Sequence, residues 1–185
     1  SIWKGGKNLF AGSGYADLFL SNDYGIPHLY INKEDPNKVG RQFVESGRES
    51  GVARTPKSGM NASFGDVFND GRLSIYKSNI SEPGNLVQAN DLWVPKQGPA
   101  GAVPQYDDVA SSLGVDLGGW SWGAQFGDLN NDGTLDLYLT NGYISAGERG
   151  SYWYDFAVIA VGHSAIIGDA ATWPAMKGRS LSGYQ

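Results

Sequence analysis

The chain has 185 residues, a formal net charge of −5 and a sequence pI of about 4.9, and it contains no cysteine. This acidic balance leaves no basic stripe for a nucleic acid or an anionic membrane surface. The lack of cysteine excludes disulfides, thiolate metal sites and cysteine catalysis. The longest apolar run, residues 156–167, contains Gly162, His163 and Ser164 and is too short to span a bilayer.

Short strands separated by turn residues are expected along the chain. In chain order, the predicted strands are residues 29–32, a strand around Phe43, residues 120–126 and residues 135–140. The third of these alternates Trp120, Trp122, Ala124 and Phe126 with other residues, and this period of two is typical of a β-strand with one buried face. We therefore expect both tryptophans in the core.

Two stretches, residues 28–80 and 91–142, are copies of one unit, and the end of the unit recurs a third time at residues 14–22, where Asp17 matches Ser74. The matched pairs of the two longer copies include His28 with Asp91, Leu29 with Leu92, Tyr30 with Trp93, Phe43 with Tyr106, Phe64 with Phe126, Tyr76 with Tyr138 and Asn79 with Asn141. A nearly constant spacing of roughly 60 residues indicates repeated supersecondary units, each unable to bury its apolar face alone.

The second copy contains a loop, residues 128–136, that we call the third loop. Its oxygen-bearing side chains stand at positions 1, 3, 5 and 9, with a glycine at position 6: Asp128, Asn130, Asp132, Asp136 and Gly133. This is the pattern of a calcium loop, in which several oxygens converge on one ion and the backbone turns sharply. We expect the four side chains and the Thr134 carbonyl to bind Ca²⁺, with water completing the shell. An EF-hand would have Glu at position 12, where this chain has Leu139, so the loop leads into a strand.

The two earlier copies of this loop are expected to be weaker. The middle loop, residues 66–74, keeps two carboxylates but has Phe68 at position 3; its remaining candidate site residues are Asp66, Asp70, Arg72 and Ser74. We predict weak calcium binding or none, with the arginine neutralising the carboxylates in place of a metal. The earliest copy has Leu9, Ala11 and Ser13 at positions 1, 3 and 5 and keeps only Asp17, so it is expected to bind nothing.

Four short antiparallel strands per unit, joined by glycine-rich turns, are typical of a β-propeller blade. The sequence therefore predicts an all-β fold: a partial β-propeller of about three four-stranded blades of roughly 60 residues, with a non-repeat insertion near the C-terminus. The predicted single propeller fragment, 1–185, has these parts: the end of a blade (1–27), two blade units (28–80 and 91–142), an insertion (143–177) and the start of a further blade (178–185). Propellers close with about 4–8 blades, so we expect the remaining blades from the same or another chain. The insertion is either a partly helical element packed on the propeller or a partner-binding element.

Several other patterns favour structural roles. We expect left-handed turn geometry at Asn22, Asn79 and Asn141, because asparagine tolerates it. Residues 119–123 match a nucleophile elbow, but a strand and a calcium loop follow, so an enzyme is not indicated. We interpret Asp107-Asp108 as a solvated strand edge and both histidines, His28 and His163, as ordinary structural residues. The glycosylation patterns at 61–63 and 79–81 are expected to be chance matches.

Phe126-Gly127-Asp128 and the acidic loop that follows resemble the FG-GAP/VCBS repeats of integrin α-chain-type propellers. Over about residues 8–142 the chain is most similar to the group that includes the extracellular cartilage acidic protein and its bacterial ASPIC/UnbV-type relatives. The resemblance implies a calcium-stabilised propeller that is extracellular, at the cell surface or periplasmic, and that acts in adhesion, protein interaction or assembly. Its partner would be a protein or a glycan.

Two alternatives remain open from the sequence. One is a glycan-binding, lectin-like propeller with aromatic-lined pockets between the blades. The other is a non-catalytic propeller domain of a secreted carbohydrate-active enzyme, whose catalytic residues lie outside this stretch. In each reading the chain itself is not the catalyst, calcium is the cofactor, and neither a nucleic acid nor a membrane span is involved.

Overall fold

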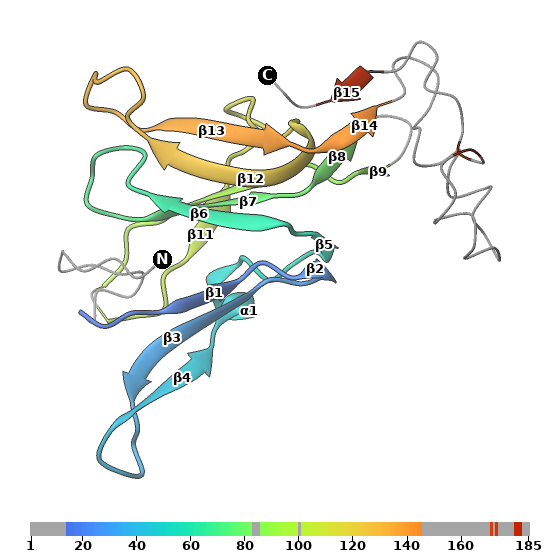
Figure 1. The fold of residues 1–185 in the computed structure, drawn as a ribbon. Helices are drawn as coiled ribbons and strands as arrows, with labels where there is room; N and C mark the ends of the chain where they lie inside the picture. The colour runs from blue at the N-terminus through green and yellow to red at the C-terminus, as the bar shows by residue number, and fades with distance from the viewer. Residues whose placement is uncertain are drawn as a thin grey trace.

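A computed structural model describes residues 14–82, 86–99, 101–145, 171, 173 and 180–182, and these form an all-β fold (Figure 1). Its strands pair antiparallel, and none of the described sheets closes on itself. The only α-helix among the described residues is α1 (Gly47–Ser50), a single turn that ends at Gly51 in the left-handed conformation. The predictions for residues 9–13, for most of the insertion at 143–177 and for most of 178–185 lie outside the described residues.

Three larger sheets make up the body of the molecule. The N-terminal sheet has the order β1 (Leu18–Leu20), β3 (His28–Glu34), β4 (Arg41–Glu45). The central sheet has the order β11 (Tyr106–Asp108), β10 (Asp91–Pro95), β7 (Ser74–Ser78), β6 (Asn61–Gly65). The C-terminal sheet has the order β13 (Asp136–Asn141), β12 (Gly119–Gly127), β8 (Ile80–Glu82), β9 (Leu86–Val87). Two small ribbons pair β2 (Asp23–Gly25) with β5 (Lys57–Ser58) and β14 (Tyr143–Ser145) with β15 (Ser180–Ser182).

The four strands predicted from the sequence are confirmed as β3, β4, β12 and β13. Each contains the predicted residues within one position, and β3 and β12 extend beyond them at both ends. The central sheet takes its four antiparallel strands in chain order, but the β8–β9 hairpin, which joins the C-terminal sheet, lies between β7 and β10 in the sequence. Strands β6 and β7 of the central sheet come from the first sequence copy, residues 28–80, and β10 and β11 come from the second, residues 91–142. One sheet therefore combines the end of one copy with the start of the next.

The strand registers repeat in the same way as the sequence. Leu18 pairs with Tyr30 in the N-terminal sheet, and their counterparts one repeat later, Ile75 and Trp93, pair in the central sheet. The same holds for the next pair of sheets. Phe64 pairs with Ile75 in the central sheet, and Phe126 pairs with Leu137 in the C-terminal sheet. Equivalent positions in neighbouring sheets therefore occupy equivalent places in the hydrogen-bonded ladder.

The central sheet lies between the other two and is buried on both faces (Figure 1). Toward the N-terminal sheet, the first core cluster consists of Phe19, Leu29, Ile31, Val52, Ile75, Trp93, Val103 and Tyr106. Toward the C-terminal sheet, the second consists of Tyr76, Leu92, Ala110, Ala124 and Phe126, with Leu135, Leu137 and Leu139 packed against it. Because strand residues alternate, Ile75 enters the first cluster and Tyr76 the second. All five residues of β7 are buried as a result.

Side chains of β6 also tie the central sheet to β12 of the C-terminal sheet. The Ala124 N–H donates a hydrogen bond to Asn61 Oδ1, and the Phe126 N–H donates one to Ser63 Oγ, both at 3.1 Å. These bonds satisfy backbone donors of β12 that its own ladder does not use. Strands β6 and β12 therefore run side by side as neighbours from adjacent sheets (Figure 1).

Two expectations about individual residues are wrong. Asn22 has the predicted left-handed geometry, with φ of 46°, but Asn79 and Asn141 are not among the described residues with positive φ. Asn79 is fully buried instead, and its side-chain amide donates a hydrogen bond to the Ala89 carbonyl. Trp122 is exposed rather than in the core, because a bulge between Ser121 and Gly123 breaks the alternation on which that prediction depended.

Candidate functional site

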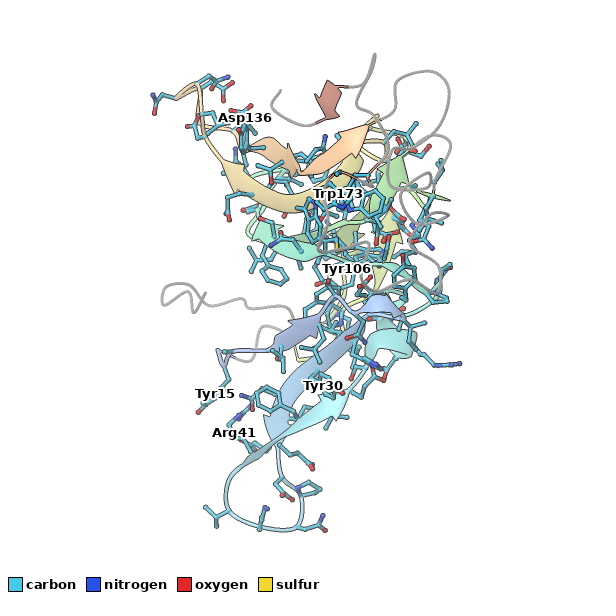
Figure 2. All side chains as sticks on the ribbon, turned by 45° about the vertical axis from the view of Figure 1, so that its right-hand side comes forward. Tyr15, Tyr30, Arg41, Tyr106, Asp136 and Trp173 are labelled. Atoms are coloured by element: carbon cyan, nitrogen blue, oxygen red, sulfur yellow. The ribbon has the colours of Figure 1, made fainter. Side chains whose placement is uncertain are left out.

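The middle loop and the third loop lie next to each other at one end of the stacked sheets (Figure 1). The middle loop joins β6 to β7, and the third loop joins β12 to β13. They touch directly, since Asn69 Nδ2 donates a hydrogen bond to the Gly133 carbonyl at 3.0 Å. Asp136 lies where the third loop enters β13 (Figure 2).

The two loops have the same backbone shape. At the fourth position Asn69 and Asn131 have φ of 53° and 59°, and at the sixth position Gly71 and Gly133 have φ of 80° and 85°. Asparagine and glycine are the residues that adopt this left-handed geometry at low cost. The shared turn therefore follows from residue types that the two loops have in common.

The aspartate at the first position holds this turn in both loops. Asp66 accepts hydrogen bonds from the N–H groups of the fifth and sixth positions at 2.9 and 2.7 Å. Asp128 accepts the equivalent bonds at 3.0 Å each. Each carboxylate oxygen has a further lone pair, so these bonds do not exhaust its capacity to bind a cation.

The third loop supplies further oxygen atoms that are held by the loop itself. Asn130 Oδ1 accepts the Asp132 N–H at 2.9 Å, and Asp132 Oδ1 accepts both the N–H and the hydroxyl of Thr134, at 2.8 and 2.5 Å. Asp136 Oδ2 accepts the Leu129 N–H at 2.9 Å, which joins the two ends of the loop. Hydrogen bonds from Thr134 and Asn130 lower the pKa of Asp132, which keeps it ionised.

The middle loop has a cation of its own. The Arg72 guanidinium contacts Asp70, with Nε at 3.1 Å from Oδ2, and donates from a second nitrogen to the Pro95 carbonyl at 2.8 Å. The hydrogen bond from Arg72 lowers the pKa of Asp70. Phe68 at the third position is exposed, and Ser74 at the ninth is buried in β7. Arg72 thus lies against a carboxylate in the loop that lacks the Asn and Asp donors.

The donors of the third loop fit a hard divalent cation by type: three carboxylates, one amide oxygen and one backbone carbonyl. In the part of the chain that the structure describes, no Lys or Arg lies within ion-pair distance of Asp128, Asp132 or Asp136. Within the same residues, no three His, Cys, Asp or Glu side chains lie close enough together to form a group that could hold a metal ion. The carboxylates are therefore positioned by loop N–H groups and have not converged on one point.

Of the earliest loop copy, the structure describes only the end. Asp17 Oδ1 accepts the Asn32 N–H at 2.8 Å, so this carboxylate serves the edge of β3. Leu9, Ala11 and Ser13 lie outside the described residues.

The other polar motifs have structural surroundings. Asp107 is exposed and pairs with Lys96 at 2.8 Å, whereas Asp108 Oδ1 accepts the N–H groups of Leu92 and Ala110, both at 3.1 Å. Burial raises the pKa of Asp108. The two carboxylates thus act separately, one on the surface and one in a turn, and not as a catalytic pair.

The remaining patterns also fall in ordinary places. Ser121 is fully buried inside β12 and lacks the strand-to-helix turn that a nucleophile elbow requires. His28 Nδ1 lies 3.3 Å from Glu45 Oε1, and His163 is outside the described residues. Of the two glycosylation patterns, Asn79 is fully buried and the Asn61 side chain is bonded to β12.

Sequence reasoning missed a buried charged group at the far end of β7. Lys57 Nζ and Lys77 Nζ lie 2.5 and 3.2 Å from the two carboxylate oxygens of Asp91, although Lys77 lacks hydrogen-bond alignment. Asn79 Nδ2 donates to the same carboxylate at 3.0 Å. Burial lowers the pKa of Lys77. The burial of Lys77 could have been predicted from the sequence. Lys77 lies two residues after Ile75 in the same strand, so both side chains point into the core.

The comparisons with known proteins give no family for this chain. A scan against protein-family models finds no match. A search of curated proteins finds none either. Among the described residues, no helix is long and apolar enough to cross a membrane.

Proposed function

We propose that the chain is a calcium-binding module of stacked β-propeller blades, in which the ion has a structural role. The face-to-face stacking of the three sheets and the matching strand registers of neighbouring sheets support a repeated blade. A sheet buried on both faces is what blade packing requires, because each inner blade has two neighbours.

The observation that carries the calcium proposal is the contrast between the two loops. The two loops have the same backbone shape. In the middle loop, where the set of calcium-binding oxygens is incomplete, the Arg72 guanidinium lies against the Asp70 carboxylate. Where the donor set is complete, no described side chain supplies a positive charge. Three carboxylates on one loop repel each other unless a cation lies between them, so the third loop is the one that needs an ion.

The residues that would hold the ion are Asp128, Asn130, Asp132 and Asp136 through their side chains and Thr134 through its carbonyl. Calcium would supply charge neutralisation and a link between the end of β12 and the start of β13. The hydrogen bonds that Asp128 accepts already hold the turn of this loop.

The proposed setting is outside the cell, at the cell surface or in the periplasm. The third-loop carboxylates are exposed, and calcium sites of extracellular modules have Kd values of about 10⁻⁴–10⁻³ M, which is the range we expect for this loop. In that setting the module would act as a stabilised scaffold for adhesion, protein interaction or assembly. The partner would be a protein or a glycan bound by surfaces other than the ion itself.

Calorimetric titration with Ca²⁺ and Mg²⁺ tests the proposal, with thermal unfolding measured in parallel. We expect one calcium site on the wild-type chain, weaker magnesium binding and a higher Tm with calcium. Asp132→Ala should abolish the site. The matched control is Asp70→Ala in the middle loop, which should leave calcium binding unchanged. A wild-type chain with no calcium-dependent rise in Tm would overturn the proposal.

A further inference from the structure

One buried carboxylate of the central sheet lies between two lysines. Asp91 of β10 has a side chain that is 5% exposed. Lys57 Nζ lies 2.5 Å from its Oδ1, and Lys77 Nζ lies 3.2 Å from its Oδ2. The Lys57 ammonium by itself neutralises this carboxylate. A second ammonium without its own counter-ion is costly to bury, so Lys77 is the amine that burial drives toward its neutral form.

The surroundings of the Lys77 amine are those of a nucleophile. Its side chain is 1% exposed, and Nζ has no aligned hydrogen-bond acceptor among the described residues. The centre of the Trp93 ring lies 5.5 Å from Nζ. Burial lowers the pKa of Lys77, and burial also raises the pKa of Asp108, the other acidic group that interacts with it. Both shifts favour a neutral amine, and a desolvated neutral lysine is nucleophilic.

The sequence repeat shows that the fold does not need a lysine at this position. Lys77 and Asp91 are directly opposite each other in the antiparallel ladder of β7 and β10. The equivalent opposite pair in the N-terminal sheet is Leu20 and His28. In the C-terminal sheet the residue that matches Lys77 is Leu139. Leucine therefore fills the position in both other sheets, and the amine next to a carboxylate is particular to the central sheet.

The groups around Asp91 are those that amide formation requires. Asn79 Nδ2 donates a hydrogen bond to Oδ2 at 3.0 Å, where negative charge develops when an amine attacks the carboxyl carbon. Lys57 Nζ donates to Oδ1 and also to the Ala89 carbonyl, at 3.1 Å, which holds it in place. The Lys57 side chain is 17% exposed, so it can exchange protons with solvent. An amine, a carboxyl group, an oxyanion donor and a proton donor thus meet at one buried point.

We propose that Lys77 and Asp91 become joined by an intramolecular isopeptide bond that links β7 to β10. The lone pair of Lys77 Nζ forms a bond to Asp91 Cγ, and the bond between Cγ and Oδ1 breaks. Oδ1 leaves as water, taking one proton from Nζ and one from the Lys57 ammonium, which solvent then reprotonates. The step needs no oxidant or reductant, and the amide that forms costs less to bury than a charged carboxylate and ammonium. The inference is independent of the calcium site.

Intact mass spectrometry of the purified chain, after overnight incubation in the folded state, tests this bond. Wild type should be lighter than its sequence by one water molecule, and Lys77→Met should have its full sequence mass. The matched control is Lys96→Met, which removes the amine of an exposed ion pair, 2.8 Å from Asp107, and should still lose one water molecule. Circular dichroism of each variant checks that the strands are retained.

Tryptic digestion locates the bond. Trypsin does not cleave after an acylated lysine, so the peptides that contain Lys77 and Asp91 should appear as one cross-linked species. An aspartyl succinimide, such as one at Asp70-Gly71, loses the same mass but regains it in mild alkali, whereas an isopeptide bond does not. Lys57→Met should leave most of the chain unlinked, because loss of a general acid slows such a step by about a hundredfold or more.

Three results would overturn the inference. They are a wild-type chain with its full sequence mass, recovery of the missing water in mild alkali, and a cross-linked species that contains Lys57 in place of Lys77. Complete linkage in Lys57→Met would overturn the proposed reaction as well, since it would show that the proton comes from another group.

Discussion

Arg72 of the middle loop lies against Asp70, whereas Thr134 takes the equivalent position in the third loop and donates its N–H and hydroxyl to Asp132. Both loops nevertheless follow the same turn, with left-handed residues at the fourth and sixth positions. The turn is therefore set by the first aspartate and by residues that tolerate positive φ, and it needs no ion. Charge balance is the separate property in which the two loops differ.

The largest expected effect separates the loops by their response to calcium. Calcium at a hundredfold excess over its Kd stabilises the state that binds it by about 2.7 kcal/mol. We expect this gain in wild type and in Asp70→Ala, and its loss in Asp132→Ala, when urea unfolding is measured with calcium and with chelator. Equal calcium dependence in the two variants would show that the loops do not differ in this way.

Replacing the glycine at the sixth position tests whether the two loops depend equally on their shared turn. Gly71→Ala and Gly133→Ala place a methyl group in open space, since nothing lies within 4 Å of the added carbon. The cost is then conformational and is expected to be about 1–2 kcal/mol in each loop, because an L-residue is strained at positive φ. Chemical denaturation without calcium should give similar losses for the two variants. Very different losses would mean that the two turns are not equivalent.

Introducing the missing oxygen donors should convert the middle loop into a second calcium site. In Phe68→Asn/Arg72→Thr/Ser74→Asp, the residues at the third, seventh and ninth positions of this loop are replaced by those of the third loop. The calcium stoichiometry in a calorimetric titration should rise from one to two, and a tenfold excess over the new Kd stabilises by about 1.4 kcal/mol. The variant with Ser74 retained is the control for burying a new carboxylate in β7. A stoichiometry that stays at one in both variants would contradict the idea that side chains alone set competence.

The smallest expected effect concerns acid stability without calcium. Hydrogen bonds lower the folded-state pKa of Asp70 and Asp132 below the ordinary carboxyl value. Each group therefore contributes stability that is present above the unfolded pKa and is lost as the pH falls through the lower folded value. Arg72→Thr should remove only the part that belongs to Asp70, giving a shallower slope of stability against pH below about 4. An unchanged slope would show that the Arg72 contact does not hold the carboxylate.

Local patterns predicted much of this fold, because they report on one strand or one turn at a time. The alternation around Leu137 and Leu139 gave β13, and the shared glycine gave the turn at Gly71 and Gly133. Trp122 was misplaced because a bulge changes the parity of a strand, and the prediction did not use Gly123, the glycine at the bulge that could have marked it. The group around Lys77 and Asp91 was missed because the partners come from three strands, and their meeting depends on sheet order.

The burial of β7 on both faces has a consequence for how the chain folds and opens. All five residues of this strand are buried, so the strand is stabilised only after the sheets on both sides have packed against it. Its backbone amides should exchange with solvent only when the whole stack opens, while β1 and β13 at the two ends open in smaller, cheaper events. Hydrogen exchange should therefore become slower from the two outer sheets toward Ile75 and Tyr76. The strand that is stabilised last in folding is then also the last whose amides exchange with solvent.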